Sequence, residues 1–326
     1  MSTIDAIASS SPLAVPAPNE GCPPPLRCRD VWRNVHEQAS VWERASTRGA
    51  TLSGWTLGRG PTVVFIAPFS GSADLFALVA WLLRDEIRSI AVQWQSTGQS
   101  RSPADFAHDV WDVIDHDGSE PVSLYGTNWS GAVALEAARL RPDRVETVFV
   151  QDGFVQRRLS LAERGLANLA LWSRRSLSEC PNRERVQMLN HRRWFPPLDP
   201  ERWSCFLETT GRNPVSVLAR QGLACKGVDF RRAFTNWTAP TWLISTEGAG
   251  PRAHQHHAEL QACLPSAKTE WMHTTGTHAS FTHPHRIAKF LRQALGVNPS
   301  PAATPVESCC SGADACESNE QPTGNR

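Results

Sequence analysis

The sequence predicts an α/β protein with a mostly parallel sheet and helices on both of its faces. Short, continuous apolar runs, which are typical of strands buried on both faces, alternate with segments of helical apolar spacing. The connections between them are short, and strands joined through helices in this way lie parallel. With 40% hydrophobic and 20% charged residues, a chain of 326 residues also has enough apolar material for a sizeable core.

The alternation begins at residue 41. We expect a hairpin over residues 41–47 and 50–57, followed by a buried strand at 62–67 with the sequence TVVFIA. A helix is expected to begin at Pro103, because Ser102 suits the cap position and proline suits the first turn. The other elements expected in this half are strands at 87–94, 121–126 and 145–150, and helices at 73–84 and 130–140.

The alternation of strands and helices stops at residue 153. From there to residue 238 only helical segments are expected, among them 159–172 and 200–208. Strands at 241–245 and 269–274 and helices at 254–264 and 284–295 then complete the pattern. We therefore expect an α/β core over residues 31–152 and 239–297, interrupted by a helical segment over 153–238.

Both ends of the chain are expected to be unfolded. Residues 1–30 and 298–326 are rich in small and polar residues and proline, and cannot bury enough surface to offset the entropy of ordering. Cys309, Cys310 and Cys316 in the second segment suggest either a soft-metal site or free thiols, and we expect free thiols. No C-x-x-C spacing and no phosphate-binding glycine loop is present, so we expect no metal and no cofactor.

The overall charge is balanced, with 33 Lys+Arg against 32 Asp+Glu. This argues against nucleic acid or an anionic membrane as the main partner. No apolar run approaches the roughly 18 residues of a membrane span, and residues 1–10 lack the regions of a secretory signal. We expect a cytoplasmic protein with a small-molecule partner, and the oligomeric state stays open.

One turn carries most of the functional information. A buried strand runs into a helix through Gly126-Thr127-Asn128-Trp129-Ser130. This is the setting of a nucleophile elbow, G-x-nucleophile-x-G, in which a strained turn projects one side chain above the sheet. Asn128 stands at the projecting position, and asparagine tolerates unusual backbone angles well. Ser130 replaces the second glycine.

On these residues the chain resembles the α/β-hydrolase superfamily. Residues 124–152 are similar to the elbow, helix and next strand of that fold, and the resemblance extends over residues 41–295. Gly98-Gln99-Ser100 matches the end of a loop of that fold. Asn128-Trp129 is similar to the Asp-Trp pair of haloalkane dehalogenases and epoxide hydrolases, whose aspartate is the nucleophile. The resemblance implies an α/β-hydrolase fold with a helical cap (153–238) after the sixth strand.

The resemblance also assigns roles to other residues. His278 matches the catalytic histidine and Asp152 an acid found in some haloalkane dehalogenases, with Glu247 as the alternative acid. The backbone N–H groups of Trp129 and Phe69 match the oxyanion hole. Phe69 replaces the halide-binding asparagine of haloalkane dehalogenases, which counts against dehalogenation.

Histidines also occur on the helix expected at 254–264. His254, His256 and His257 could ligate a metal, but we expect them on a solvated helix face. The tryptophans and arginines of the helical segment suggest either a small helical core or an aromatic pocket for an apolar or aromatic ligand.

Asparagine changes the chemistry, because an amide is not a nucleophile under these conditions. Four hypotheses follow. In the first, His278 with Asp152 acts as a general base while Asn128 donates a hydrogen bond. In the second, the protein is catalytically silent and binds a ligand or partner. In the third Ser130 is the nucleophile, and in the fourth Asn128 deamidates to aspartate. The first is slightly favoured because a histidine and a candidate acid are retained.

Overall fold

The computed structural model describes residues 26–95, 101–195, 199–225, 227–231, 233–274, 276 and 278–298. These residues lie in one unit, Leu26–Pro299. The loop with Gly98-Gln99-Ser100 and the cysteines expected to be free in the tail lie outside the described residues.

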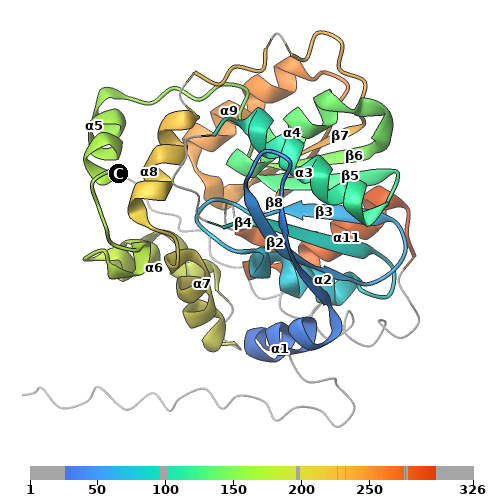
Figure 1. Ribbon diagram of the computed structural model, residues 1–326, viewed down its shortest axis with the longest axis horizontal. Helices are drawn as coiled ribbons and strands as arrows, with labels where there is room; N and C mark the ends of the chain where they lie inside the picture. Colours follow the sequence, from blue (N-terminus) through green and yellow to red (C-terminus); the bar gives the residue numbers. More distant parts are fainter. Residues whose placement is uncertain are drawn as a thin grey trace, which may run out of the picture. The chain divides into compact units, whose positions relative to one another are not determined.

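The centre of the unit is one eight-stranded sheet in the order β1-β2-β4-β3-β5-β6-β7-β8 (Figure 1). The pairs β1–β2 and β2–β4 are antiparallel, and all other neighbouring pairs are parallel. Every strand expected from the sequence is present, with ends shifted by one or two residues. The strands are β1 (Ser40–Ala45), β2 (Thr51–Leu57), β3 (Thr62–Ile66), β4 (Arg88–Trp94), β5 (Val122–Thr127), β6 (Val145–Gln151), β7 (Thr241–Thr246) and β8 (Lys268–Met272).

Helices cover both faces of this sheet, as expected. In β3 the side chains alternate between two cores: Val64 and Ile66 lie in one, and Val63 and Phe65 in the other. One core is closed by α3 (Pro103–Asp117), α4 (Trp129–Leu140) and α9 (Pro251–Cys263). The other is closed by α1 (Cys28–Gln38), the 3-10 turn η1 (Ala73–Phe76), α2 (Ala77–Leu83), α10 (Ala279–Thr282) and α11 (Pro284–Leu295).

The helix α1 corrects one expectation, because residues 28–30 were expected to be unfolded. Its buried side chains, Cys28, Val31 and Val35, recur at helical spacing and join the second core. A buried ion pair supports its start: the Asp199 carboxylate accepts from the Cys28 amide at 2.9 Å and from the Arg202 guanidinium at 3.0 Å. These partners are about 170 residues away in the chain, so no local pattern indicates the helix.

Between β6 and β7 the described residues form helices, loops and two isolated β-bridges, and we call residues 153–238 the helical insertion. Figure 1 shows its helices grouped beside the sheet, in green and yellow. The helices are α5 (Leu161–Ala170), η3 (Leu177–Glu179), α6 (Arg183–His191), η4 (Arg192–Trp194), α7 (Glu201–Gly211) and α8 (Val215–Ala224). Two shorter turns outside it are η2 (Pro142–Arg144) and η5 (Glu247–Ala249).

Candidate functional site

The turn between β5 and α4 has a strained backbone. Asn128 has φ 50° and ψ −107°, which a side chain adopts at a cost on the order of 1–3 kcal/mol. The close approach of strand and helix explains Gly126, since a Cβ there would lie 2.2 Å from the Ser130 carbonyl oxygen. The Asn128 amide donates to the Gln151 carbonyl at 2.8 Å, which fixes the turn to the end of β6. The sequence therefore located this sharp turn correctly.

Ser130 serves the turn itself. Its hydroxyl accepts from the Thr127 amide at 2.9 Å and donates to the Thr127 carbonyl at 3.1 Å, and the residue is fully buried. A hydroxyl that is buried and bonded in this way has no free path to a substrate. The position argues against Ser130 as the alternative nucleophile.

His278 lies just before α10 and faces the helical insertion. Its ring contacts Phe206 of α7, with centroids 4.8 Å apart, and His191 of α6, at 5.3 Å. Burial, and secondarily the neighbouring His191, lowers the pKa of His278 to about 3. The imidazole is therefore neutral at pH 7, which is the form that accepts a proton. Its Nδ1 atom has no hydrogen-bond partner among the described residues.

Asp152 directly follows β6 in a left-handed conformation, with φ 48°, and is buried. Its carboxylate accepts from the Thr246 amide at 3.0 Å, the Thr246 hydroxyl at 2.8 Å and the Gln151 side chain at 3.2 Å. Burial raises the pKa of Asp152 to about 6, although these hydrogen bonds oppose the rise. Among the described residues, no hydrogen bond joins Asp152 to His278.

Gln151 connects the parts of this site, and the sequence analysis missed it. Its side chain accepts from the Tyr125 hydroxyl at 2.6 Å and donates to the Gly276 carbonyl at 2.6 Å. It thereby links β5, the end of β6 and the loop that carries His278. The available signal was a polar residue directly after the apolar run Val148-Phe149-Val150 of β6. His191 was also missed, and the sequence offered no signal for it beyond its being a histidine.

The alternative acid, Glu247, lies elsewhere. Its carboxylate is 3.1 Å from Nδ1 of His273, and both side chains are more than half exposed. Glu247 therefore has a histidine partner other than His278.

The two residues expected in the oxyanion hole do come together. The rings of Phe69 and Trp129 are in contact, and Phe106 packs against both. Within the described part of the chain, the backbone N–H groups of Phe69 and Trp129 have no acceptor. The Asn213 side chain, which precedes α8, donates to the Phe69 carbonyl at 2.5 Å and so ties this loop to the helical insertion.

A cavity lies between this loop and α8. Its wall includes the loop after β3, the end of β4, α3 and the insertion, through Pro68, Phe69, Trp94, Phe106, Val217 and Gln221. The cavity is partly aromatic, but its aromatic residues, Phe69, Trp94 and Phe106, all lie outside the insertion, whose tryptophans do not line it. Neither Asn128 nor His278 is among its lining residues.

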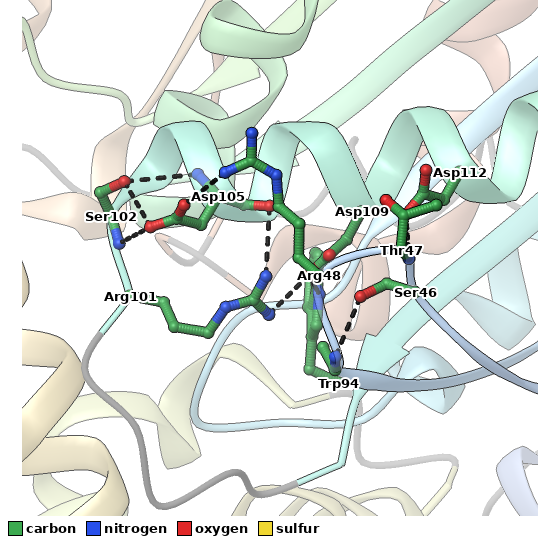
Figure 2. Close-up of polar contacts among 10 residues, drawn as sticks. Ser46, Thr47, Arg48, Trp94, Arg101, Ser102, Asp105, Asp109 and Asp112 are labelled. Carbon is green, nitrogen blue, oxygen red and sulfur yellow. Dashed lines mark hydrogen bonds and ion pairs between the residues drawn. The ribbon is translucent and has the colours of Figure 1, made fainter.

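A buried ion pair supports the same wall. Nη1 of Arg101 lies 2.6 Å from Oδ2 of Asp109, and both side chains are buried. The Trp94 indole donates to the same carboxylate oxygen at 2.8 Å, and the Arg101 guanidinium lies 4.8 Å from the centroid of the Phe106 ring. Figure 2 shows Arg101 and Trp94 beside the start of α3. The pair therefore fixes both aromatic residues, and the sequence analysis did not identify it.

The histidines of α9 do not form a cluster. His254 bonds the Thr246 carbonyl at 2.9 Å through Nε2. In the described part of the chain, no three His, Cys, Asp or Glu side chains come close enough to hold a metal ion. None of the described helices is long and apolar enough to cross a membrane.

The strand order and the turn at Asn128 can now be compared with known proteins. A thermophilic esterase from Thermogutta terrifontis is 17% identical, with a TM-score of 0.64 over 79% of this chain and 98% of that chain. A hydrolase from Pseudomonas aeruginosa PA01 is 16% identical, with a TM-score of 0.67 over 79% and 99%. A bromoperoxidase from Bacillus anthracis is 17% identical, with a TM-score of 0.63 over 79% and 100%.

The chain has the α/β-hydrolase fold. No protein-family model matches it. Because the three similar structures carry different activities in their names, the fold alone does not select a reaction.

Proposed function

We propose that this protein is an enzyme that acts on a small organic molecule by non-covalent general-base chemistry. His278 takes a proton from a water molecule or from an acidic position of the substrate, and Asn128 donates a hydrogen bond to the substrate. The observation that carries the proposal is a buried histidine whose Nδ1 has no partner among the described residues, on the loop that Gln151 ties to the strained turn at Asn128. A carboxamide at the apex excludes a covalent ester intermediate there.

The similar structures support hydrolysis as the general type of reaction. Two of them are described as an esterase and a hydrolase. We propose hydrolysis or a lyase-type step, with the backbone N–H groups of Phe69 and Trp129 stabilising a developing oxyanion. These two groups have no acceptor among the described residues, which leaves them free for that role.

Asp152 is the acid we assign to His278. It is ionised at pH 7 with a pKa of about 6, and it lies next to Gln151, which bonds the histidine loop. A carboxylate near the imidazole would stabilise the imidazolium formed on proton transfer. Catalytic hydrogen bonds are often absent without substrate, so this role requires the Asp152–His278 bond to form in the bound state.

We further propose that the helical insertion (153–238) is a cap that shapes the substrate pocket, and that the protein acts in the cytoplasm. The contacts of Asn213 with the Phe69 carbonyl and of Phe206 with His278 support the first part.

A second candidate function is ligand binding without catalysis. The specific observation in its favour is that Asp152 is fully engaged by Thr246 and Gln151, with no bond to His278. Such a protein would keep the pocket and lose turnover.

The test is a screen of the purified chain against esters, epoxides, haloalkanes and carbon acids. We expect turnover of one class, and we expect His278→Ala to lower kcat by about 100-fold or more. His273→Ala is the matched control, because His273 is an exposed histidine beside the same loop. Equal turnover of both variants would remove His278 from the mechanism.

Intact-mass measurement separates the remaining hypotheses. We expect the unmodified mass before and during turnover, since no covalent intermediate forms. A chain one unit heavier would indicate that Asn128 has become aspartate. Absence of turnover across the screen, together with saturable binding of a substrate analogue, would favour the ligand-binding function.

A further inference from the structure

Exposed large apolar side chains are concentrated in one short stretch of the described chain. Seven of the nine that the structure contains lie between residues 161 and 189. They include Leu161 at 82% exposed, Leu169 at 72% and Trp172 at 87%. The full set is Leu161, Leu166, Leu169, Trp172, Val186, Met188 and Leu189, which we call the apolar cap face.

Four residues of the apolar cap face lie on α5 or just after it, and the other three lie on α6. Leu166 and Leu169 share one stripe of α5, and Trp172 follows at the same spacing two residues beyond the end of the helix. The opposite side of α5 packs against α8, so the stripe faces away from the molecule. No residue of α5 is buried. Figure 1 shows α5 and α6 at the outer side of the helical insertion, with α8 and α7 between them and the sheet.

Positive charge surrounds this face. The helical insertion holds 15 Lys+Arg against 7 Asp+Glu, and the rest of the chain holds 18 against 25. The near-neutral total therefore conceals an insertion with a charge of +8 and a remainder with −7. Arg174, Arg175 and Arg185 are exposed between and beside the apolar residues, and none has an ion-pair partner among the described residues.

We propose that the apolar cap face docks on the surface of an anionic lipid bilayer. Leucine and tryptophan on one helix side with arginines at its border is the pattern of helices that lie in the interface of a membrane. Arginines near the surface are attracted by anionic headgroups, and residues 26–152 and 239–298 are nearly neutral, with 17 Lys+Arg against 19 Asp+Glu, so the insertion is the region attracted to the lipid. Because no described helix can span the bilayer, the attachment is peripheral.

Charge selects lipid over a second copy of the chain. A symmetric dimer would place the same face of both copies together, and two insertions of charge +8 would then repel. This also revises the expectation drawn from the overall charge, which excluded an anionic membrane because it averaged two regions of opposite sign.

The test is sedimentation of the full chain with vesicles. We expect the protein to pellet with vesicles of phosphatidylcholine containing about a third phosphatidylglycerol, and to stay in solution with phosphatidylcholine alone. Binding should weaken as salt is raised. A chain that stays in solution with anionic vesicles at low salt would overturn the proposal.

Three variants assign the binding to this face. L166S/L169S/W172S should lower the partition onto anionic vesicles by about tenfold or more, since the apolar contact is lost. R174Q/R175Q should lower it by about tenfold on anionic vesicles. Val41→Ser removes an exposed apolar residue of β1, at 62% exposed, and should change nothing.

Two further results would count against the proposal. Unchanged binding by the triple variant would mean that another surface meets the lipid. A wild-type dimer in light scattering that the triple variant converts to a monomer would assign the face to a second copy. Circular dichroism of each variant verifies that the fold is retained.

Discussion

The sheet region and the helical insertion of this chain differ in how far their helices are buried and in their charge. In α4 ten of the twelve residues are buried, whereas in α5 none of the ten is. The sheet region is nearly balanced in charge, with 17 Lys+Arg against 19 Asp+Glu, whereas the insertion has an excess of arginine. Both regions contain helices that bury apolar side chains, such as Phe206 of α7 in the insertion, but the helix α5 of the insertion buries none. The insertion leaves apolar side chains exposed next to its arginines, and the proposed contact with lipid rests on this difference.

The largest expected difference between the regions concerns aromatic side chains. Phe149 of β6 is fully buried and packs against Tyr125 and Phe290, so Phe149→Ala should lower the free energy of unfolding by about 3–5 kcal/mol. Trp172→Ala removes a larger ring that is 87% exposed and should change it by less than about 0.5 kcal/mol. Urea titration of both variants measures the two effects. A cost above about 2 kcal/mol for Trp172→Ala would mean that the apolar cap face is already covered within the chain.

Removal of an ion pair should also cost more stability in the sheet region than at the insertion, although the difference is smaller than for the aromatic side chains. Asp109→Asn leaves the Arg101 guanidinium buried without its charge partner, and we expect a loss of about 3 kcal/mol. Arg252→Gln removes an exposed pair with Glu163 at 3.0 Å, which joins α9 to α5, and should cost less than about 1 kcal/mol. Thermal unfolding of both variants tests the difference. Equal losses would show that the insertion is held to the sheet region more tightly than its exposure indicates.

The pH dependence of stability should depend on His278, a residue of the sheet region that contacts the helical insertion. His278 has a folded pKa of about 3, below the value of about 6.5 in the unfolded chain, so the unfolded state binds more protons below pH 6.5. Stability is therefore lost as the pH falls, by about 2 kcal/mol between pH 7 and 5. His278→Gln should remove that part of the slope, while His273→Gln should keep it.

Asp152 acts in the opposite direction. Its folded pKa of about 6 lies above the unfolded value of about 3.9, so its ionisation destabilises the folded state as the pH rises from about 4 to 6. Asp152→Asn should therefore steepen the loss of stability on acidification. Denaturant titrations at several pH values separate the two groups, and a variant slope equal to that of the wild type would contradict the assigned burial of that residue.

Sequence could predict the sheet because its signals are local. The run TVVFIA and the small residues around Asn128 are each readable within ten positions, and both interpretations are confirmed. The helix α1 was missed because its partners, Asp199 and Arg202, lie far away in the chain. Gln151 was missed for the same reason, since its bond to Gly276 joins residues 125 positions apart.

The expectation drawn from charge used only the sum over the whole chain. The total of +1 is correct, but a field at a surface depends on where charges lie rather than on their sum. The sequence did contain this information, because 15 of the 33 basic residues fall within the helical insertion. Counting by segment would have revealed the contrast between the regions.

Two glycines provide the smallest and most local comparison. Gly126→Ala would place a Cβ 2.2 Å from a backbone oxygen at the turn, so the turn must shift and stability should fall by about 1–3 kcal/mol. Gly165 of α5 has open space around its Cα, and Gly165→Ala should stabilise the chain by about 0.5–1 kcal/mol through helix propensity. Urea titration gives both values.

If the tight turn exists to hold Asn128 for function, Gly126→Ala should also reduce the turnover per folded molecule. Gly165→Ala should leave turnover unchanged. A Gly126→Ala chain that is as stable as the wild type would contradict the close approach of β5 and α4 on which the site depends.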